Sequence, residues 1–231
     1  MVSVLSAAFD DVRALDVVPV EGVADARVGD VSDPGVAADA CRDRDALVIA
    51  HMAPNRPGVY DEPALPFDVN VKGAALLFDQ ALRCGVRRVV LISSMGVVRG
   101  RDRSDRFLHS EHPMQTRGLY GLTKICQEMI AEHYHRNHGL PVAVLRPAYI
   151  VDADSGEDKY GRKLKEANWQ FTDRRDIAGA TVAALRKPDL EYGVYPVMSH
   201  PAATEYTDIG RTYHELGWRP QYMVDGPRGG R

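Results

Sequence analysis

The chain has 231 residues, 45% of them hydrophobic, and its 29 Lys+Arg against 32 Asp+Glu leave a formal net charge of −3. That length fits one domain, which buries enough apolar surface to fold without disulfides or a metal. The balanced charge excludes a basic field for nucleic acid or an anionic membrane, and no apolar run approaches the ~20 residues of a transmembrane helix. We therefore expect a cytoplasmic protein with no nucleic-acid or membrane partner.

The first half of the chain alternates short apolar runs with helical stretches. Apolar runs bounded by charges or turn residues are typical of buried parallel strands. Asp33, followed by Pro34, predicts a helix N-cap and first helical position, and Gly85 predicts a helix end. The expected elements are a strand at 12–16, a helix at 33–43, a strand at 46–50, a helix at 70–84 and a strand at 86–93.

The second half continues the alternation. Gly139 closes a long helix, and Pro147 ends the strand that follows it. The expected elements are a helix at 120–138, a strand at 142–145, a helix at 176–186, a strand from Tyr192 and a short helix ending at Gly217. Strands that alternate with helices in this way favour a doubly wound parallel sheet with helices on both faces.

Tyr120 and Lys124 carry the first chemical signal. Four residues apart on a helix, they share one face, and the apolar residues 122, 125, 129 and 130 centre on the opposite side, which we expect to be buried. A lysine ammonium beside a phenol lowers the tyrosine pKa and makes it a usable general acid or base. Taken alone, the pattern is more typical of a surface aromatic–lysine pair than of a catalytic one.

Two further positions could complete a site with this pair. Ser93 and Ser94 end the strand at 86–93, and ligands of a parallel sheet bind at the carboxyl ends of its strands. A hydroxyl there could orient a substrate oxygen while the tyrosine moves its proton. Asn70 opens the preceding helix, where it is either an N-cap or a part of the catalytic site.

Several segments, in this order, match a known family. They are Asp30 in VGDVSD, His51-Met52-Ala53, Asn70-Val71-Lys72-Gly73, LISS, LYGLTK, LRPAYI, TDRRDIAGA and ELGWRP. Together they resemble the extended short-chain dehydrogenases/reductases, also called NAD-dependent epimerases/dehydratases. Within that family, GLYGLTK, NWQFTDRRDIAG and LGWRPQ are similar to segments of the uronate dehydrogenase-like members.

The resemblance implies a Rossmann-like fold. Residues 1–225 would form one domain, with a small C-terminal substrate lobe from about 150 to 225, and residues 226–231 would be a flexible tail. It also implies a homodimer that associates through the helices at 70–84 and 120–138. The apolar run 76–78 is compatible with that contact and equally with burial inside one chain.

The resemblance also implies NAD as the cofactor and assigns residues to it. Asp16, at the end of the strand at 12–16, would hold the ribose 2′-hydroxyl of NAD and repel the 2′-phosphate of NADP. The implied cofactor-binding residues are Asp16, Asp30, Val31, Ala53, Lys124 and Pro147; the catalytic residues are Tyr120, Lys124, Ser94 and Asn70; the substrate-binding residues are Arg162, Ser94 and Tyr120.

Arg162 falls where the uronate dehydrogenase-like members have a carboxylate-binding arginine. A planar guanidinium pairs bidentately with a carboxylate, which supports this role. The alternative is a solvated basic loop, because three lysines surround it between residues 159 and 165.

The sequence departs from the family at its start. Relatives have a strand followed by G-x-x-G-x-x-G, which binds the cofactor diphosphate, but the first glycine here is Gly22. The family's first β-α unit is therefore expected to be missing or replaced. Residues 2–9 would be a short strand in its place or the last turn of the lost helix.

A second departure concerns the catalytic hydroxyl. Many relatives have a third Ser or Thr after the serine pair, but Met95 stands at that position. Methionine cannot donate the hydrogen bond, so Ser94 must take the role.

The cysteines and histidines predict neither a disulfide framework nor a metal site. Cys41, Cys84 and Cys126 are odd in number and widely spaced, which is typical of reduced core thiols. The three histidines of the run 133–138 do not converge on one side of a helix, so a solvated helix end explains them better.

Three functional hypotheses follow. The first is an NAD-dependent oxidoreductase or epimerase/dehydratase that acts on a sugar or hydroxy-carbonyl compound. The second is a cofactor-independent proton-transfer enzyme, an isomerase, lyase or cyclase, that keeps Tyr120 and Lys124 without the dinucleotide. The third is a non-catalytic relative built on the same scaffold.

Overall fold

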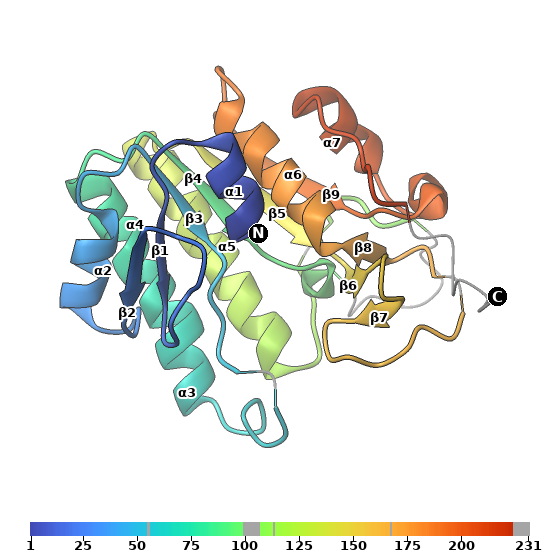
Figure 1. Cartoon of the computed structure of the whole chain (residues 1–231), viewed down its shortest axis with the longest axis horizontal. Coiled ribbons are helices and arrows are strands. Elements are labelled where there is room, and N and C mark those ends of the chain that lie inside the picture. The colour runs from blue at the N-terminus through green and yellow to red at the C-terminus, as the bar shows by residue number, and fades with distance from the viewer. Residues whose placement is uncertain (55, 99–106, 113, 167, 224–231) are drawn as a thin grey trace.

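A parallel sheet with helices on both faces forms the centre of the computed structural model, which describes residues 1–54, 56–98, 107–112, 114–166 and 168–223 (Figure 1). The strands are β1 (Arg13–Asp16), β2 (Asp25–Val28), β3 (Ala46–Ile49), β4 (Arg88–Ile92), β5 (Val142–Pro147), β6 (Tyr149–Asp152), β7 (Glu157–Asp158), β8 (Phe171–Asp173) and β9 (Tyr192–Val197). The α-helices are α1 (Val2–Ala8), α2 (Pro34–Cys41), α3 (Ala64–Pro66), α4 (Gly73–Arg83), α5 (Leu119–His138), α6 (Arg174–Arg186) and α7 (Ile209–Glu215). A π-helix (Phe67–Lys72) and short 3₁₀ helices (Met95–Val97 and Pro201–Glu205) complete the elements.

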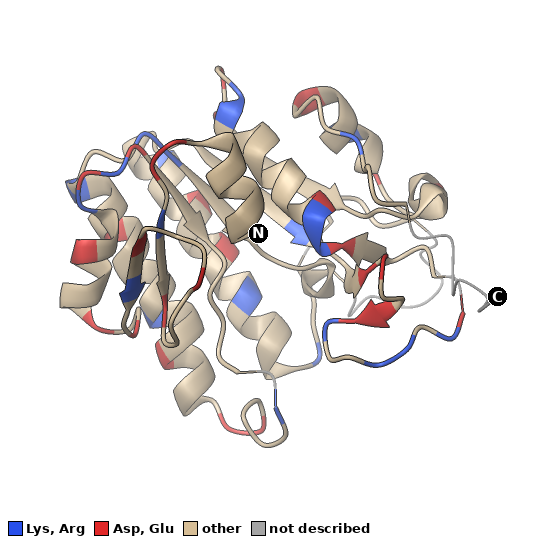
Figure 2. Ribbon diagram, viewed as in Figure 1, with Lys and Arg blue, Asp and Glu red and all other residues tan. Residues whose placement is uncertain are grey.

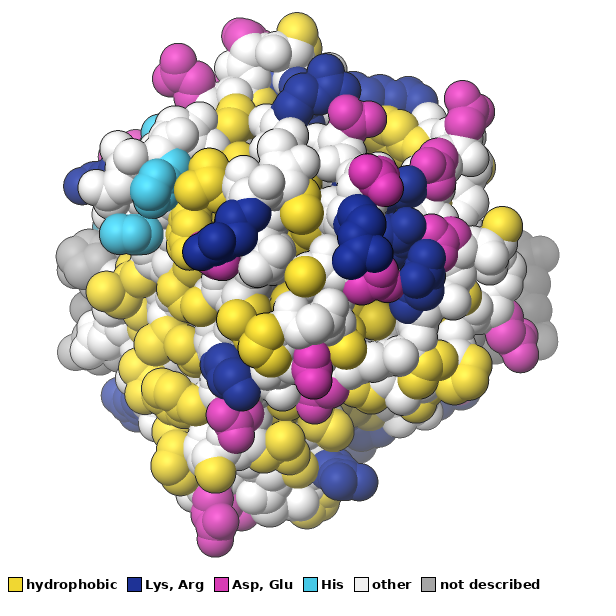
Figure 3. All heavy atoms as spheres, turned by 90° about the vertical axis from the view of Figure 1, so that its left-hand side faces the viewer, with side chains coloured by type: hydrophobic (Ala, Val, Ile, Leu, Met, Phe, Trp, Pro, Cys, Tyr) yellow, Lys and Arg dark blue, Asp and Glu magenta, His cyan; other side chains and the backbone are white. Residues whose placement is uncertain are grey.

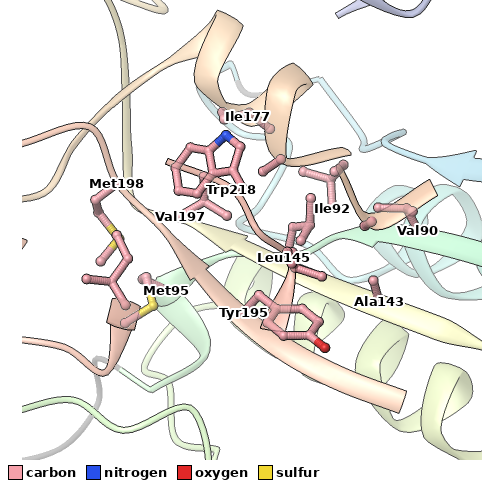
Figure 4. Close-up of a cluster of buried hydrophobic side chains, with 14 of the residues drawn as sticks. Val90, Ile92, Met95, Ala143, Leu145, Ile177, Tyr195, Val197, Met198 and Trp218 are labelled. Atoms are coloured by element: carbon pink, nitrogen blue, oxygen red, sulfur yellow. The ribbon is translucent and has the colours of Figure 1, made fainter. Parts of the chain in front are cut away.

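The central sheet has the order β3-β4-β5-β9, and all its neighbouring strands are parallel. Successive side chains of a strand point to opposite faces, and β4 shows this clearly. Val89 and Leu91 pack against α2, α4 and α5, whereas Val90 and Ile92 pack against α6 and α7. Figure 4 shows the second of these clusters, in which Trp218 and Ile177 lie against the strands. The predicted parallel sheet with helices on both faces is confirmed.

Local signals placed the helix ends correctly. The Asp33 carboxylate accepts hydrogen bonds from the backbone N–H groups of Gly35 (2.7 Å) and Val36 (3.1 Å), and Pro34 is the first residue of α2. Gly139 follows α5 in the left-handed conformation, with φ of 67°, a backbone state that glycine adopts without strain.

The parallel strands do not form one continuous sheet. In the described part of the chain, β1 pairs with β2 alone and β3 pairs with β4 alone, so no ladder joins β1 to β3. Side chains attach the β1–β2 pair to α2 instead. Arg13 pairs with Asp25 across the two strands (2.7 Å) and donates to the backbone oxygen of Asp39 in α2 (2.7 Å).

The first element of the chain is a helix, so the alternative that residues 2–9 form a strand is wrong. Leu5 is buried, and α1 packs against α6. The Arg186 guanidinium donates to the backbone oxygen of Ala8 (2.8 Å) and lies over the Phe9 ring. The helix therefore covers the α6 face of the molecule and contributes no edge to the sheet.

The C-terminal part adds a small sheet, β7-β6-β8, beside the central one. Its core consists of Val151, Ala153, Leu164 and Phe171. The predicted division into a main domain and a lobe from about residue 150 stays a prediction, and the tail at 226–231 lies outside the described residues. In the described part of the chain, no helix is both long and apolar enough to cross a bilayer. Of the three cysteines predicted to be core thiols, Cys41 is buried, Cys84 exposed and Cys126 half-buried.

The long helix α5 buries the face that we expected to be exposed. Thr123, Lys124, Gln127 and Glu128 are buried, whereas Leu122 and Met129 are 41% and 57% exposed. The prediction of a buried apolar stripe is therefore only partly right, since Ile125 and Ile130 are half-buried against the hydrophobic clusters but Leu122 and Met129 are not. The polar side chains can be buried because polar groups inside the fold bind them, and their burial then costs little. Figure 3, which views the side where α2 and α4 lie, shows hydrophobic side chains gathered over part of that surface.

Candidate functional site

Ser94 and Tyr120 meet where β4 ends and α5 begins. Ser94 is the N-cap of the 3₁₀ helix after β4, and its Oγ accepts a hydrogen bond from the backbone N–H of Gly96 (3.0 Å). The same hydroxyl hydrogen-bonds the phenol of Tyr120. Met95, the residue at the family's third hydroxyl position, is buried in the apolar cluster on the α6 face. The structure thus brings Ser94, and not residue 95, to the phenol.

Burial raises the pKa of Tyr120, and the hydrogen bond from Ser94 opposes that shift only in part. The half-buried ring also packs edge-to-face on Tyr60, with ring centroids 5.6 Å apart. Burial is the largest cause of the shift, and Lys124 is not among its causes, so the structure gives no support to the prediction that Lys124 lowers the pKa of Tyr120. A phenol of raised pKa is protonated at neutral pH and is ready to donate its proton.

Lys124 lies one turn along the same helix and is 2% exposed. Its Nζ donates a hydrogen bond to the backbone oxygen of Ile92, the last residue of β4 (2.9 Å). Burial lowers the pKa of its ammonium to about 8, and the Glu128 carboxylate opposes this shift. Tyr120, Ser94 and Lys124 therefore form one cluster at the carboxyl end of β4.

Asn70 supports this cluster from the neighbouring helix. It lies inside the π-helix and not at a helix start, so the prediction that Asn70 opens the helix, with its N-cap alternative, is wrong. Its Oδ1 accepts from the backbone N–H of Ala53 (2.6 Å), and its Nδ2 donates to Thr123 Oγ1 in α5 (2.8 Å). Gln127 Nε2 donates to the Asn70 backbone oxygen (2.8 Å). Asn70 thus connects the loop after β3 to the helix that carries Tyr120 and Lys124, and such π-turns are frequent at functional sites.

The residues assigned to the cofactor follow the carboxyl ends of four strands. Asp16 ends β1, Asp30 follows β2, Ala53 follows β3 and Pro147 ends β5. Asp16 and Asp30 are exposed, and Pro147 and Ala53 are buried.

The ends of β2 and β3 lie together at the start of α4. A Cβ on Gly73 would stand 2.7 Å from Val31 Cγ2 and 3.2 Å from His51 Nε2. Gly73 is thus the point where the loops after β2 and β3 and the helix approach one another, and a larger residue there would push them apart.

These residues fit two parts of a dinucleotide. The exposed carboxylates of Asp16 and Asp30 suit the hydroxyls and amine of an adenosine, and the cluster of Ser94, Tyr120 and Lys124 suits a reacting sugar end. His51 Nε2, on the loop after β3, is a buried ring nitrogen without a hydrogen-bond partner among the described residues. Residues 1–54 contain no glycine before Gly22 and offer no glycine-rich turn, so no described residue is assigned to the diphosphate.

Arg162 lies in the segment that follows β7, where Figure 2 shows several basic residues. Its Nε and Nη2 both bind Asp158 Oδ2, each at 2.7 Å. A nearby pocket is lined by Tyr149, Leu164, Phe171, Asn168 and the charged side chains of Arg162, Lys163, Lys165 and Glu166. Carboxylate binding by Arg162 stays a prediction, and it would require the substrate to replace or share Asp158.

Sequence reasoning missed the groups that pack behind the cluster. Glu128 forms a buried ion pair with Arg146 of β5 (2.6 Å) and accepts a hydrogen bond from Ser93. Burial lowers the pKa of His51 to about 4, and the positive charge of Lys124 contributes to this shift. A usable signal existed, because Glu128 stands four residues after Lys124, the spacing that already linked Tyr120 to Lys124.

A family model described as NAD(P)H-binding matches residues 5–188 of the chain. The match begins close to the first residue and by itself does not show that an opening β-α unit is missing. An uncharacterized chloroplastic protein of Arabidopsis thaliana is 27% identical over 194 residues, which are 77% of this chain and 56% of the relative. The chain thus spans little more than half the length of that relative.

A second relative is matched over most of its length. L-arabinose 1-dehydrogenase (NAD(P)+) of Haloferax volcanii is 22% identical over 227 residues, 89% of this chain and 87% of the relative.

Solved structures show the same fold at low identity. A short-chain dehydrogenase/reductase superfamily protein from Agrobacterium tumefaciens with bound NAD superposes with a TM-score of 0.81 at 20% identity, covering 96% of this chain and 90% of that one. Uronate dehydrogenase from Agrobacterium tumefaciens has a TM-score of 0.77 at 21% identity, covering 97% and 80%. The fold of the chain is therefore that of the short-chain dehydrogenases/reductases.

Proposed function

The chain belongs to the NAD(P)H-binding family, and we propose that it is an NAD(P)-dependent oxidoreductase or epimerase acting on a sugar or hydroxy-carbonyl compound. The observation that carries the proposal is the contact between Ser94 and Tyr120 beside the buried Lys124. Asp16 at the end of β1 and Asp30 after β2 add to it. The names of the relatives, which include a sugar dehydrogenase and a uronate dehydrogenase, support it as well.

The residues divide the work as follows. Ser94 donates a hydrogen bond to the reacting oxygen of the substrate and holds it near the phenol. Tyr120 gives its proton to that oxygen as a carbonyl is reduced, and takes the proton back when the alcohol is oxidised. The Lys124 ammonium would hold the ribose next to the reacting ring, and Asp16 and Asp30 would hold the adenosine half. NAD(P), when bound, supplies or accepts the hydride.

A direct test is titration with NADH and NADPH, followed by the fluorescence of the nicotinamide. We expect NADH to bind more tightly, because the Asp16 carboxylate accepts a hydrogen bond from the 2′-hydroxyl and repels a 2′-phosphate. Asp16→Ser should weaken NADH binding about tenfold or more, because a charged hydrogen bond is lost. It should also reduce the ratio of NADH affinity to NADPH affinity. Asp10→Ser, at an exposed position before β1, is the matched control and should bind as the unaltered chain does.

Failure to bind either nucleotide at millimolar concentration would overturn the proposal. The second candidate, a cofactor-independent proton-transfer enzyme, would then be favoured, because residues 1–54 offer no glycine-rich turn and the sheet is divided between β1 and β3. Preference for NADPH would contradict only the role given to Asp16 and would leave the rest of the proposal standing.

We also propose that the protein forms a homodimer through the outer face of α5. Leu77 and Phe78 of the predicted run are buried within the chain and give no support. The exposed side chains of Leu122 and Met129 do, because exposed apolar side chains that share a helix face mark interaction surfaces.

Sedimentation velocity tests the dimer. We expect Met129→Glu to convert it to a monomer, since an unpaired carboxylate would have to be desolvated in the contact. Val28→Glu places the same charge on an equally exposed apolar position of β2 and should leave the dimer intact. A monomer in the unaltered chain, or a dimer in Met129→Glu, would refute this surface.

A further inference from the structure

A buried carboxylate lies directly behind the proposed site. Glu128 follows Lys124 by one turn of α5 and is 2% exposed. It accepts two hydrogen bonds from Arg146, from Nε to Oε1 at 2.9 Å and from Nη2 to Oε2 at 2.6 Å. It accepts a third, short hydrogen bond from the hydroxyl of Ser93. A carboxylate and a guanidinium are rarely this buried unless each is fully paired, and here they are.

These bonds fasten α5 to the end of β4 at two successive residues. Lys124 binds the backbone oxygen of Ile92, and Glu128 binds the side chain of Ser93. The next residue along the chain is Ser94, whose hydroxyl meets Tyr120 of the same helix. The distance between Ser94 and Tyr120 is therefore set by two polar contacts of a single helix face, and Glu128 makes the second of them.

We propose that Glu128 is a positioning residue of the Ser94–Tyr120–Lys124 site. Through Ser93 its carboxylate holds the strand end that carries Ser94, and its negative charge keeps Lys124 in the ammonium form. The inference deepens the proposed function and rests on it for the catalytic consequence. The charge effect on Lys124 does not depend on turnover.

The charges around Lys124 make the second part of the proposal specific. Burial is the main cause that lowers the pKa of Lys124, the charge of Lys159 lowers it further, and the Glu128 carboxylate opposes both. Arg146 adds a positive charge behind Glu128, and His51 on the loop after β3 is neutral at pH 7 because its own pKa is about 4. Tyr120 is also neutral, so Glu128 supplies the negative charge that balances the Lys124 ammonium among the described groups that face it.

Removing Glu128 and removing Arg146 should shift the pKa of Lys124 in opposite directions. Glu128→Gln keeps the shape and an acceptor for Ser93 but leaves Arg146 uncompensated, so the pKa of Lys124 should fall by about one unit. Arg146→Met leaves Glu128 uncompensated, so that pKa should rise by about one unit. The double variant should return it near the original value, and Ser93→Ala should leave it unchanged.

The titration is measured by NMR on protein labelled with ¹³C at the lysine side chains, with Lys124→Met identifying the resonance. In turnover assays the alkaline limb of the kcat profile should follow the measured pKa of Lys124. Ser93→Ala should lower kcat about tenfold while KM stays within twofold, because it releases the strand end and leaves the charges in place.

An unchanged pKa of Lys124 in Glu128→Gln would overturn the charge role, and so would shifts of equal sign in Glu128→Gln and Arg146→Met. Full kcat in Ser93→Ala would overturn the positioning role. The NMR titration needs neither cofactor nor substrate. If the proposed function is wrong, turnover will be absent, but the pKa of Lys124 will still shift in the Glu128 and Arg146 variants. Should Arg146→Met fail to fold, Glu128→Gln and the double variant still decide the charge role.

Discussion

Replacing Tyr120 by Phe is expected to lower turnover by 10²-fold or more, the usual contribution of a positioned general acid or base. The substitution removes only the hydroxyl that Ser94 hydrogen-bonds, and the ring can still pack on Tyr60. Nucleotide affinity should therefore stay within about twofold, which fluorescence titration measures beside the steady-state rate.

Tyr134→Phe is the matched control, because Tyr134 lies on the same helix and stacks on Phe78 away from the cluster. It should keep full activity. Full activity in Tyr120→Phe would show that the phenol is not the proton donor.

The pH dependence follows from the same residue. Burial raises the pKa of Tyr120, so the protonated form that reduces a carbonyl is present at neutral pH and is lost only as the pH rises through that raised value. The Lys124 ammonium is lost earlier, near its pKa of about 8. We therefore expect the alkaline limb of carbonyl reduction to report Lys124 first.

The Arg146→Met variant should lose about 3–5 kcal/mol of unfolding free energy, the usual cost of leaving one buried charge without its partner. Arg146 is 3% exposed and also donates to the backbone oxygen of Ser110 (2.8 Å), which would lose its partner as well. Urea denaturation at neutral pH measures the change.

A double variant, Glu128→Gln with Arg146→Met, should recover a large part of that loss. It removes both charges, so neither is left desolvated alone, and the apolar surroundings accept a neutral pair. If the double variant were as unstable as Arg146→Met, packing of the guanidinium would be responsible and not its charge. Arg87→Met, in an exposed pair with Asp45, should cost less than about 1 kcal/mol and serves as the surface control.

Features that depend on near neighbours in the chain were predicted well. Asp33 and Pro34 begin α2, and Gly139 ends α5, because caps and left-handed glycines act within a few residues. The apolar run at 86–93 predicted β4, and the spacing of Tyr120 and Lys124 predicted that both lie on one helix face.

Features that depend on distant partners were not. The apolar residues Leu122 and Met129 indicated the wrong buried face of α5, because the groups that bind Lys124 and Glu128 come from β4 and β5. The sequence predicted a helix start at Asn70, whereas the backbone there forms a π-helix and the Asn70 side chain hydrogen-bonds Ala53 and Thr123.

The sequence by itself determined which segments become helices and strands and that the strands are parallel with helices on both faces. It also indicated Ser94, Tyr120 and Lys124 as the members of the candidate site. Periodicity, caps and motif spacing are local, and they are readable without knowing where the chain returns. Only the tertiary structure decided that the sheet divides between β1 and β3, that α5 buries its polar face, and that burial raises the pKa of Tyr120. Each of these depends on desolvation and on partners far along the chain, and those exist only once the strands and helices have packed.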